Sequence, residues 1–187
     1  MKILRVDMTD QTVKTEDVPE IYAGLGGRGL TSTLVNREVP PRCDPLGPEN
    51  KLIFAPGFMS GTALINTSRV SVGAKSPLTG TVKESNVGGT AGTALGKLGI
   101  TAVVVEGAAP EGEWFILRVD QHGGVSIAPA DEFAGMGTYA FTERMLAAYG
   151  DKTAVLAVGP AGERRLLAAS IQSSDVDGRP CRAAGRG

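Results

Sequence analysis

Alternation of apolar and polar residues predicts most of the strands in this chain. Residues 2–8 (KILRVDM) alternate as a strand with one buried face does, and residues 69–75 (RVSVGAK) repeat the pattern. The polar run 9–12 separates the first strand from a second at 13–18, which predicts a hairpin. Further strands are expected within residues 51–57, 81–85, 101–107, 114–120, 124–130 and 165–174, and residues 153–163 are expected to form a buried strand followed by a tight turn.

Helical spacing is confined to short segments. Residues 28–39 place Leu30, Leu34 and Val35 on one side of an amphipathic helix. Residues 139–150 give the clearest helix, which ends at Gly150. The side chains expected to face inward from it are Phe141, Met145, Leu146 and Tyr149. Because strands outnumber helices and many are joined as hairpins, the predicted class is α+β, with largely antiparallel β-sheets and a few short helices in one domain spanning 1–187.

The stretch 24–29 (GLGGRG) satisfies the G-x-G-x-x-G fingerprint of dinucleotide-binding proteins, and Asp44 follows Gly24 by 20 residues. That fingerprint works only where its glycines close a buried strand and open a helix. Here the preceding segment 19–24 is irregular or briefly helical, and Asp44 lies in the proline-rich loop 39–48. The context therefore argues against a nicotinamide or flavin site, and no saturable NAD binding is expected.

Composition and charge exclude several classes of protein. The chain has 187 residues, 42% of them hydrophobic, and a net charge of −1. Such a balance suits a globular domain and gives no basic face for nucleic acid. The longest apolar runs are too short to cross a bilayer, and the first residues do not form a secretory leader. We therefore expect a cytoplasmic protein that binds neither nucleic acid nor membrane.

Cysteine and histidine are too scarce for most metal and nucleophile sites. Cys43 and Cys181 are too few and too far apart for a disulfide framework, a zinc site or a four-cysteine cluster. His122 is the single histidine and lies beside Gly123 and Gly124, in what reads as a hairpin turn. We expect free thiols and a solvated histidine, and assign no catalytic residue in this chain.

The 26 glycines are the unusual feature, and three glycine-rich elements contain or adjoin arginine or asparagine. These elements are 26–30 (GGRGL), 66–69 (NTSR) followed at a distance by 86–89 (NVGG), and 182–187 (RAAGRG). Guanidinium forks and exposed glycine amides both donate hydrogen bonds to anions. Each arginine alone is consistent with a solvated surface charge. Together they predict a large, flat, phosphate-bearing cofactor laid across a β-rich surface.

A phosphate-binding P-loop does not explain these glycines. The nearest stretch, 92–98 (GTALGKL), has one residue too few between its glycines and has Leu98 where a magnesium-binding hydroxyl is required.

Several segments resemble the first domain of the tungsten-containing aldehyde ferredoxin oxidoreductases, of which the tungsten subunit of benzoyl-CoA reductase is a relative. They occur in the family's order and span nearly the whole chain, which makes the signal specific. The matching segments are 24–30 (GLGGRGL), 45–62 (PLGPENKLIFAPGFMSGT), 69–80 (RVSVGAKSPLTG), 86–92 (NVGGTAG), 155–163 (VLAVGPAGE) and 182–187 (RAAGRG).

The resemblance implies a β-sheet saddle that carries two pterin dithiolenes holding tungsten, or sometimes molybdenum. The positions that match cofactor contacts are Arg69, Asn86, Gly88, Arg182, Ala183 and Gly185, with Arg28 and Arg186 in supporting roles. Main-chain carbonyls at Asn86 and Ala183 match ligands of a magnesium ion that bridges the pterin phosphates. Hard oxygen ligands and arginines suit such a site because they neutralise and hold phosphate.

Members of that family are much longer than this chain. Their later domains supply the cysteines of a [4Fe-4S] cluster and the acid–base groups near the metal, and no cluster ligand is assigned here. The complete enzyme is expected to oxidise aldehydes to carboxylic acids and to pass electrons to ferredoxin, whereas this portion alone is not expected to be active. The alternative is a non-catalytic pterin-binding or assembly module of a split enzyme. Either role implies partner domains or a partner subunit, and an exposed interdomain surface that favours self-association.

Overall fold

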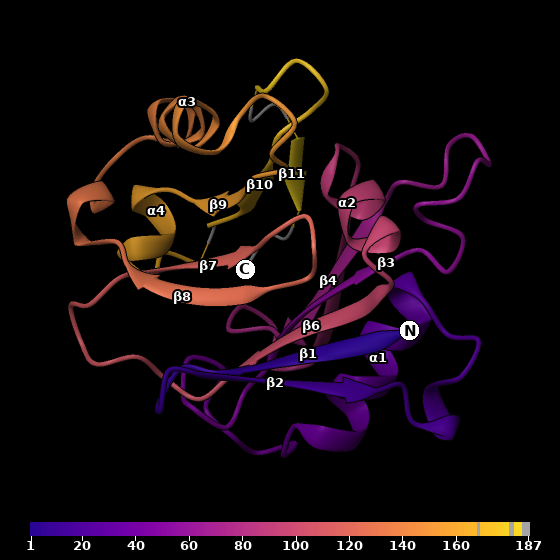
Figure 1. The fold of residues 1–187 in the computed structure, drawn as a ribbon. Helices are drawn as coiled ribbons and strands as arrows, with labels where there is room; N and C mark the ends of the chain where they lie inside the picture. Colours follow the sequence, from indigo (N-terminus) through magenta and orange to yellow (C-terminus); the bar gives the residue numbers. More distant parts are fainter. Residues whose placement is uncertain (168, 180–181, 185–187) are drawn as a thin grey trace.

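A six-stranded sheet forms the larger half of this computed structural model, which describes residues 1–167, 169–179 and 182–184 (Figure 1). The strand order is β2-β1-β6-β3-β4-β5. Among its described pairs, β1 and β6 alone run parallel, and the other neighbours are antiparallel. The strands are β1 (Lys2–Asp7), β2 (Thr12–Asp17), β3 (Leu52–Pro56), β4 (Val70–Lys75), β5 (Val82–Val87) and β6 (Ile100–Glu106).

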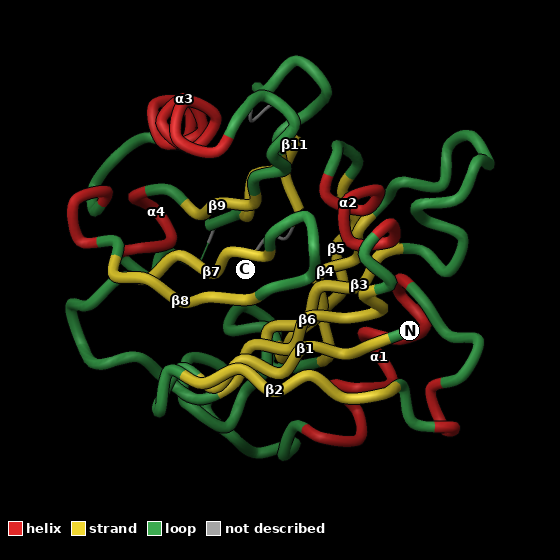
Figure 2. Tube along the Cα trace, in the orientation of Figure 1, coloured by secondary structure: helices red, strands yellow, loops and turns green. Residues whose placement is uncertain are grey.

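The smaller half contains a hairpin, a three-stranded antiparallel sheet and two helices, which stand on the far side of β6 from α1 (Figure 2). The order of the three-stranded sheet is β11-β10-β9, so β10 is central. The elements of this half are β7 (Phe115–Val119), β8 (Val125–Pro129), α3 (Thr138–Tyr149), β9 (Leu156–Val158), α4 (Pro160–Glu163), β10 (Ile171–Ser173) and β11 (Arg182–Ala184).

Helix α1 (Gly27–Glu38) covers one face of the large sheet. Its buried stripe of Leu30 and Leu34 packs with Ile53 of β3 in a core cluster. The helix approaches β4 closely because Gly73 has no side chain: a Cβ added there would lie 2.6 Å from the Cβ of Thr31. The sequence at Gly73 therefore sets the distance between α1 and the sheet.

The opposite face of the sheet carries two further apolar clusters. Val70, Val72 and Val87 pack with Ala91 of helix α2 (Ala91–Lys97), and partly buried side chains of β9 and β10 join them. Leu4, Val6, Ile100 and Val103 are covered by side chains of the β7–β8 hairpin. The sheet is thus buried on both faces, and the smaller half folds onto the face that α1 leaves open.

Two glycines of α2 allow the loop 57–69, which joins β3 to β4, to lie directly on the helix. A Cβ added at Gly92 would overlap the carbonyl oxygen of Ser68, and one added at Gly96 would overlap that of Ser60. Gly61 meets the backbone of Gly96 from the loop side with a positive φ of 83°. Backbone-to-backbone packing therefore fixes the base of this loop.

The predicted class is confirmed, and so are the first hairpin, the buried stripe of α1 and Gly150 at the C-terminus of α3. The strand predicted over 165–174 is wrong except at β10. Arg165 adopts a positive φ of 54° after α4, and the chain turns there instead of extending. Residues 160–163 form a short helix where a tight turn was expected.

The prediction that Tyr149 faces inward is also wrong. Its side chain is exposed and stacks under the guanidinium of Arg118, 4.9 Å from the ring centre. Thr142 and Met145 supply the buried side of α3 instead.

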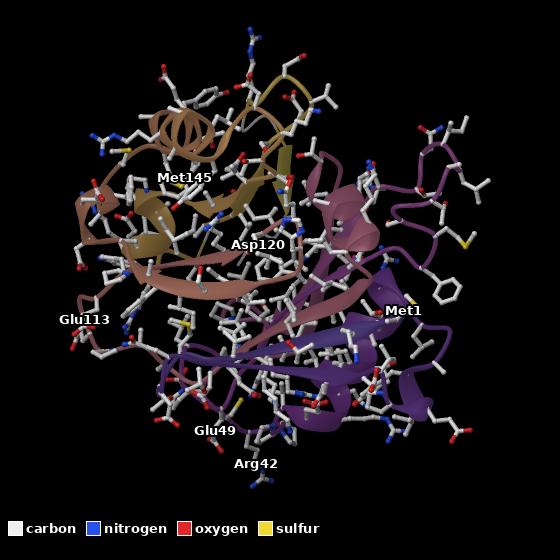
Figure 3. All side chains as sticks on the ribbon, in the orientation of Figure 1. Met1, Arg42, Glu49, Glu113, Asp120 and Met145 are labelled. Carbon is white, nitrogen blue, oxygen red and sulfur yellow. The ribbon has the colours of Figure 1, made fainter. Side chains whose placement is uncertain are left out.

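The structure confirms the solvated histidine. His122 is exposed in the β7–β8 turn, where its main-chain N–H donates to Oδ1 of Asp120 at 2.7 Å (Figure 3). Cys43 is a buried free thiol, and Cys181 lies outside the described residues. Within the described residues, no helix is long and apolar enough to cross a membrane.

A charged network ties the C-terminal end of α1 to the sheet. Arg5 of β1 donates to both carboxylate oxygens of Glu38, at 2.7 and 2.9 Å, and Lys51 donates to the same group at 2.9 Å. Tyr22 adds a hydroxyl donor at 3.0 Å. Burial raises the pKa of Glu38, but these hydrogen bonds and positive charges outweigh burial and lower the pKa to about 2.

Stability should therefore fall on acidification through this network. Because the pKa of Glu38 is lower in the folded state, its contribution is fully present above about 4.5 and is lost as pH falls toward about 2. The shift corresponds to about 3 kcal/mol at most. Glu38→Gln should lower the free energy of unfolding at pH 7 and flatten its pH dependence below pH 5, measured by urea denaturation. Glu49→Gln, an exposed carboxylate outside the network, is the matched control, and an unchanged profile for Glu38→Gln would contradict the assignment.

Gly96→Ala tests the packing of the loop on α2. Alanine favours a helix over glycine by ~1 kcal/mol, but the added Cβ must displace the backbone of Ser60. We expect a net loss of about 1–3 kcal/mol in thermal unfolding, as for other overpacked sites. Gly29→Ala is the control, since Gly29 is also a helical glycine and its added carbon would meet only a side-chain carbon of Leu25 at 3.9 Å. A more stable Gly96→Ala variant would show that the loop is not held against α2.

Candidate functional site

Arg69 and Asn86 contact one another at the end of the β4–β5 pair. Asn86 lies opposite Ser71 in the strand register. Nε of Arg69 donates to Oδ1 of Asn86, and Nη2 donates to the main-chain oxygen of Asn86 at 3.2 Å. The amide nitrogen of Asn86 in turn donates to Oγ of Ser71 at 3.2 Å. This chain of hydrogen bonds fixes the guanidinium beside an exposed edge of the sheet.

The N-terminus of α1 lies against the same strands. A Cβ added at Gly27 would lie 3.5 Å from Oγ of Ser71, and one added at Gly26 would lie 2.5 Å from the main-chain nitrogen of Phe58. Gly26 is the N-cap and offers no side-chain acceptor, so the first amides of the helix are left for another partner. The GLGGRG stretch thus does open a helix, but it follows a 3-10 turn (Glu20–Tyr22) and not a buried strand, as expected.

Arg28 belongs to this N-terminus and is paired with β5. Its Nε donates to Oε2 of Glu84 at 2.9 Å; the Arg28 side chain is 75% exposed and the Glu84 side chain only 9%. Among the described residues, Oε1 of Glu84 has no hydrogen-bond partner, although it is buried. One carboxylate oxygen therefore holds Arg28 while most of its guanidinium faces solvent.

The glycine-rich turn after β5 connects the site to the smaller half. Gly89 has a φ of 119°, and a Cβ added there would lie 2.5 Å from the main-chain oxygen of Ser174. The main-chain nitrogen of Thr90 donates to the same oxygen at 3.1 Å. Ser173 is the last residue of β10 and Ser174 follows it, so this contact aligns β10 with the end of β5. In Figure 1, β11 stands between β10 and α2, and it is in contact with β5.

The structure brings most of the predicted site residues together. Arg69 contacts Asn86, and Gly88 follows Asn86 by two positions in the chain. Arg28 lies in the first turn of α1, where it is paired with Glu84 of β5. Main-chain positions of Arg182 and Ala183 lie in β11, paired with Ser173 and Gln172 respectively. Gly185 and Arg186 lie outside the described residues. The described parts of these motifs, distant in sequence, therefore lie on neighbouring elements, namely α1, the β4–β5 pair and β11.

The donor set of this junction suits an anion. Arg69 is exposed and has no acidic partner among the described residues. Guanidinium forks and unpaired helix amides are the groups that bind phosphate in proteins. The main-chain oxygen of Asn86 accepts a hydrogen bond from Arg69, and carbonyl oxygens are also a ligand type that hard cations take. Within the described part of the chain, no group of three or more His, Cys, Asp or Glu side chains gathers to hold a metal. The donors present fit the phosphate groups of a cofactor.

Sequence reasoning missed two residues of this junction. Ser71 shares a strand face with Arg69 by simple alternation, and that period could have revealed it. Glu84 gave no comparable signal, because its pairing with Arg28 joins residues 56 positions apart.

A hollow of about 270 Å³ lies elsewhere, between β4–β5 and the smaller half. It contains Val72 and Ser85, which alternate with Ser71 and Asn86 and so face the other side of the sheet. None of the predicted site residues that the structure describes lines it. The candidate site is thus an open polar junction and not this hollow.

Comparisons with known proteins place the chain in a family. The family model described as "Aldehyde ferredoxin oxidoreductase, N-terminal domain" matches residues 3–187. The chain is 39% identical over 190 residues to a tungsten-containing aldehyde ferredoxin oxidoreductase of Pyrococcus horikoshii and 36% identical over 189 residues to that of Pyrococcus furiosus. Each match covers 100% of this chain and 30% of the relative.

A solved structure agrees with the sequence comparisons. The fold is similar to a chain of the "Active site complex BamBC of Benzoyl Coenzyme A reductase in complex with 1,5 Dienoyl-CoA", with a TM-score of 0.89 and 30% identity. That match covers 100% of this chain and 28% of the other. The chain therefore spans about 30% of the length of its relatives, and it belongs to the aldehyde ferredoxin oxidoreductase family as the family's N-terminal domain.

Proposed function

We propose that this chain is the cofactor-binding domain of a tungsten or molybdenum bis-pterin oxidoreductase. The observation that carries the proposal is the contact of Arg69 with Asn86 near the N-terminus of α1, with Asn86 in strand β5, which β11 also contacts. The names of the relatives support tungsten as the metal. In its complete form the enzyme oxidises aldehydes to carboxylic acids in the cytoplasm and passes electrons to ferredoxin.

The described residues divide the work of binding among them. Arg69 and Arg28 bind phosphate oxygens, and Asn86 orients the Arg69 fork through its side-chain and main-chain oxygens. Glu84 holds Arg28 against β5. Main-chain oxygens at Asn86 and Ala183 would hold a magnesium ion that neutralises phosphate charge. Gly88 and Arg182, together with Gly185 and Arg186 outside the described residues, would contact the cofactor by the resemblance of their positions. When bound, the cofactor supplies the metal at which the substrate is oxidised.

The rest of the chemistry belongs to the part of the protein that relatives have beyond this domain. No iron–sulfur ligand is assigned in the chain, so the [4Fe-4S] cluster and the acid–base groups come from those later domains or from a partner subunit. This portion alone is an inactive binding unit.

Arg69→Ala, made at the matching position of a full-length relative, should lower the tungsten and pterin content per polypeptide by about tenfold or more. The reason is that charge-assisted hydrogen bonds are worth roughly 1.5–3 kcal/mol each. Arg69→Lys should retain an intermediate content, because lysine keeps the charge and loses the planar fork. Metal analysis and fluorescence of the released, oxidised pterin give the two readouts.

Arg42→Ala is the matched control. Arg42 is also an exposed arginine, but it lies at the lower edge of the molecule in Figure 3, away from α2 and β11. It should leave both contents unchanged. Full tungsten and pterin in the Arg69→Ala protein would refute the assignment of Arg69 to the cofactor.

A further inference from the structure

The loop between β3 and β4 projects from the body of the molecule (Figure 2). It presents large apolar side chains at its surface. Ile65 is 86% exposed and Leu64 57% exposed, and Phe58 and Met59 near the base are about half exposed. Residues 57–68 contain no charged side chain. An uncharged apolar projection of this kind marks a contact surface.

Side-chain to main-chain hydrogen bonds within the loop fix the conformation of its tip. The hydroxyl of Ser60 donates to the main-chain oxygen of Thr67, and that of Thr67 donates to the main-chain oxygen of Leu64 at 3.0 Å. The hydroxyl of Thr62 donates to the main-chain oxygen of Met59 at 2.8 Å. With its base fixed on the glycines of α2, the loop holds its apolar tip in place before any partner arrives, which lowers the entropic cost of binding.

The stem of the loop is part of the candidate site. The main-chain nitrogen of Gly57 donates to the main-chain oxygen of Arg69 at 3.0 Å, so the loop leaves and rejoins the sheet at the proposed phosphate-binding arginine. Phe58 at the same stem lies against Gly26 of the α1 N-terminus. Any protein segment that covers a cofactor at this site must therefore pass beside the loop.

We propose that the Leu64–Ile65 tip docks into an apolar pocket on the part of a full-length family member that follows this domain. This identification of the partner rests on the proposed function. The relatives carry about 70% of their length outside the matched region, since the match covers 30% of them. The exposed side chains offer roughly a few hundred Å², whereas a stable dimer buries about 1,200 Å² or more. The tip thus suits an intramolecular contact and not a second copy of the chain.

Cysteine labelling tests the proposal. Ile65→Cys is made in this chain and at the aligned position of a full-length relative, and maleimide reaction rates are measured by peptide mass spectrometry, which separates this label from labels on Cys43 and Cys181. Glu113→Cys, an exposed position on another loop, is the reference (Figure 3). We expect position 65 to react on the order of 100-fold more slowly in the full-length protein, relative to position 113.

Equal rates at position 65 in the two proteins, or the same slowing at both positions, would overturn the proposal. A rate at position 65 of this chain that falls with protein concentration would assign the tip to a second copy and overturn it as well. Hydrogen exchange of residues 62–67 in the unsubstituted proteins gives the same comparison without a variant. Tungsten and pterin content of the full-length protein is measured separately, so that a failed docking contact and a failed cofactor assignment are distinguished.

Discussion

The hydrogen-bonded pairing of Arg69 with Asn86 is the interaction around which the candidate site is arranged. This pairing joins the residue before β4 to the C-terminal end of β5. Asn86 also donates to Ser71, which lies near Gly27 at the N-terminus of α1. The other elements meet there because glycines remove the side chains that would separate them. Gly26 lets the N-terminus of α1 lie against Phe58, and Gly89 lets the turn after β5 lie against Ser174 at the end of β10. Loss of this pairing would leave the proposed phosphate-binding guanidinium of Arg69 without a fixed position.

Two further glycines, in helix α2, hold the β3–β4 loop in place beside the junction. Where Gly92 and Gly96 face the β3–β4 loop, backbone packs on backbone, and no apolar area is needed to hold the two together. The apolar clusters lie on the two faces of the large sheet instead, and they fix the strands from which the junction projects. Apolar side chains on the two faces of the large sheet thus stabilise the fold, whereas glycines, Arg69 and Asn86 form the junction.

The periodicity of apolar residues predicted the elements whose structure depends on local burial. It failed where a contact with a residue distant in sequence determines the conformation. The stripe of Leu30 and Leu34 and the first hairpin follow from spacing alone. The turn at Arg165 and the stacking of Tyr149 on Arg118 depend on backbone and tertiary contacts that no period reveals. At the site, motif resemblance supplied Arg69 and Asn86, but Glu84 required the fold, because its partner Arg28 comes from another element.

The central claim is that this junction holds the phosphate ends of a pterin cofactor. An experimental structure of a full-length family member purified with its cofactor tests it most directly. The account predicts phosphate oxygens within about 3 Å of the guanidinium that matches Arg69, and a cation on the main-chain oxygen that matches Asn86. Phosphates bound elsewhere, with that guanidinium facing only solvent or protein, would contradict it.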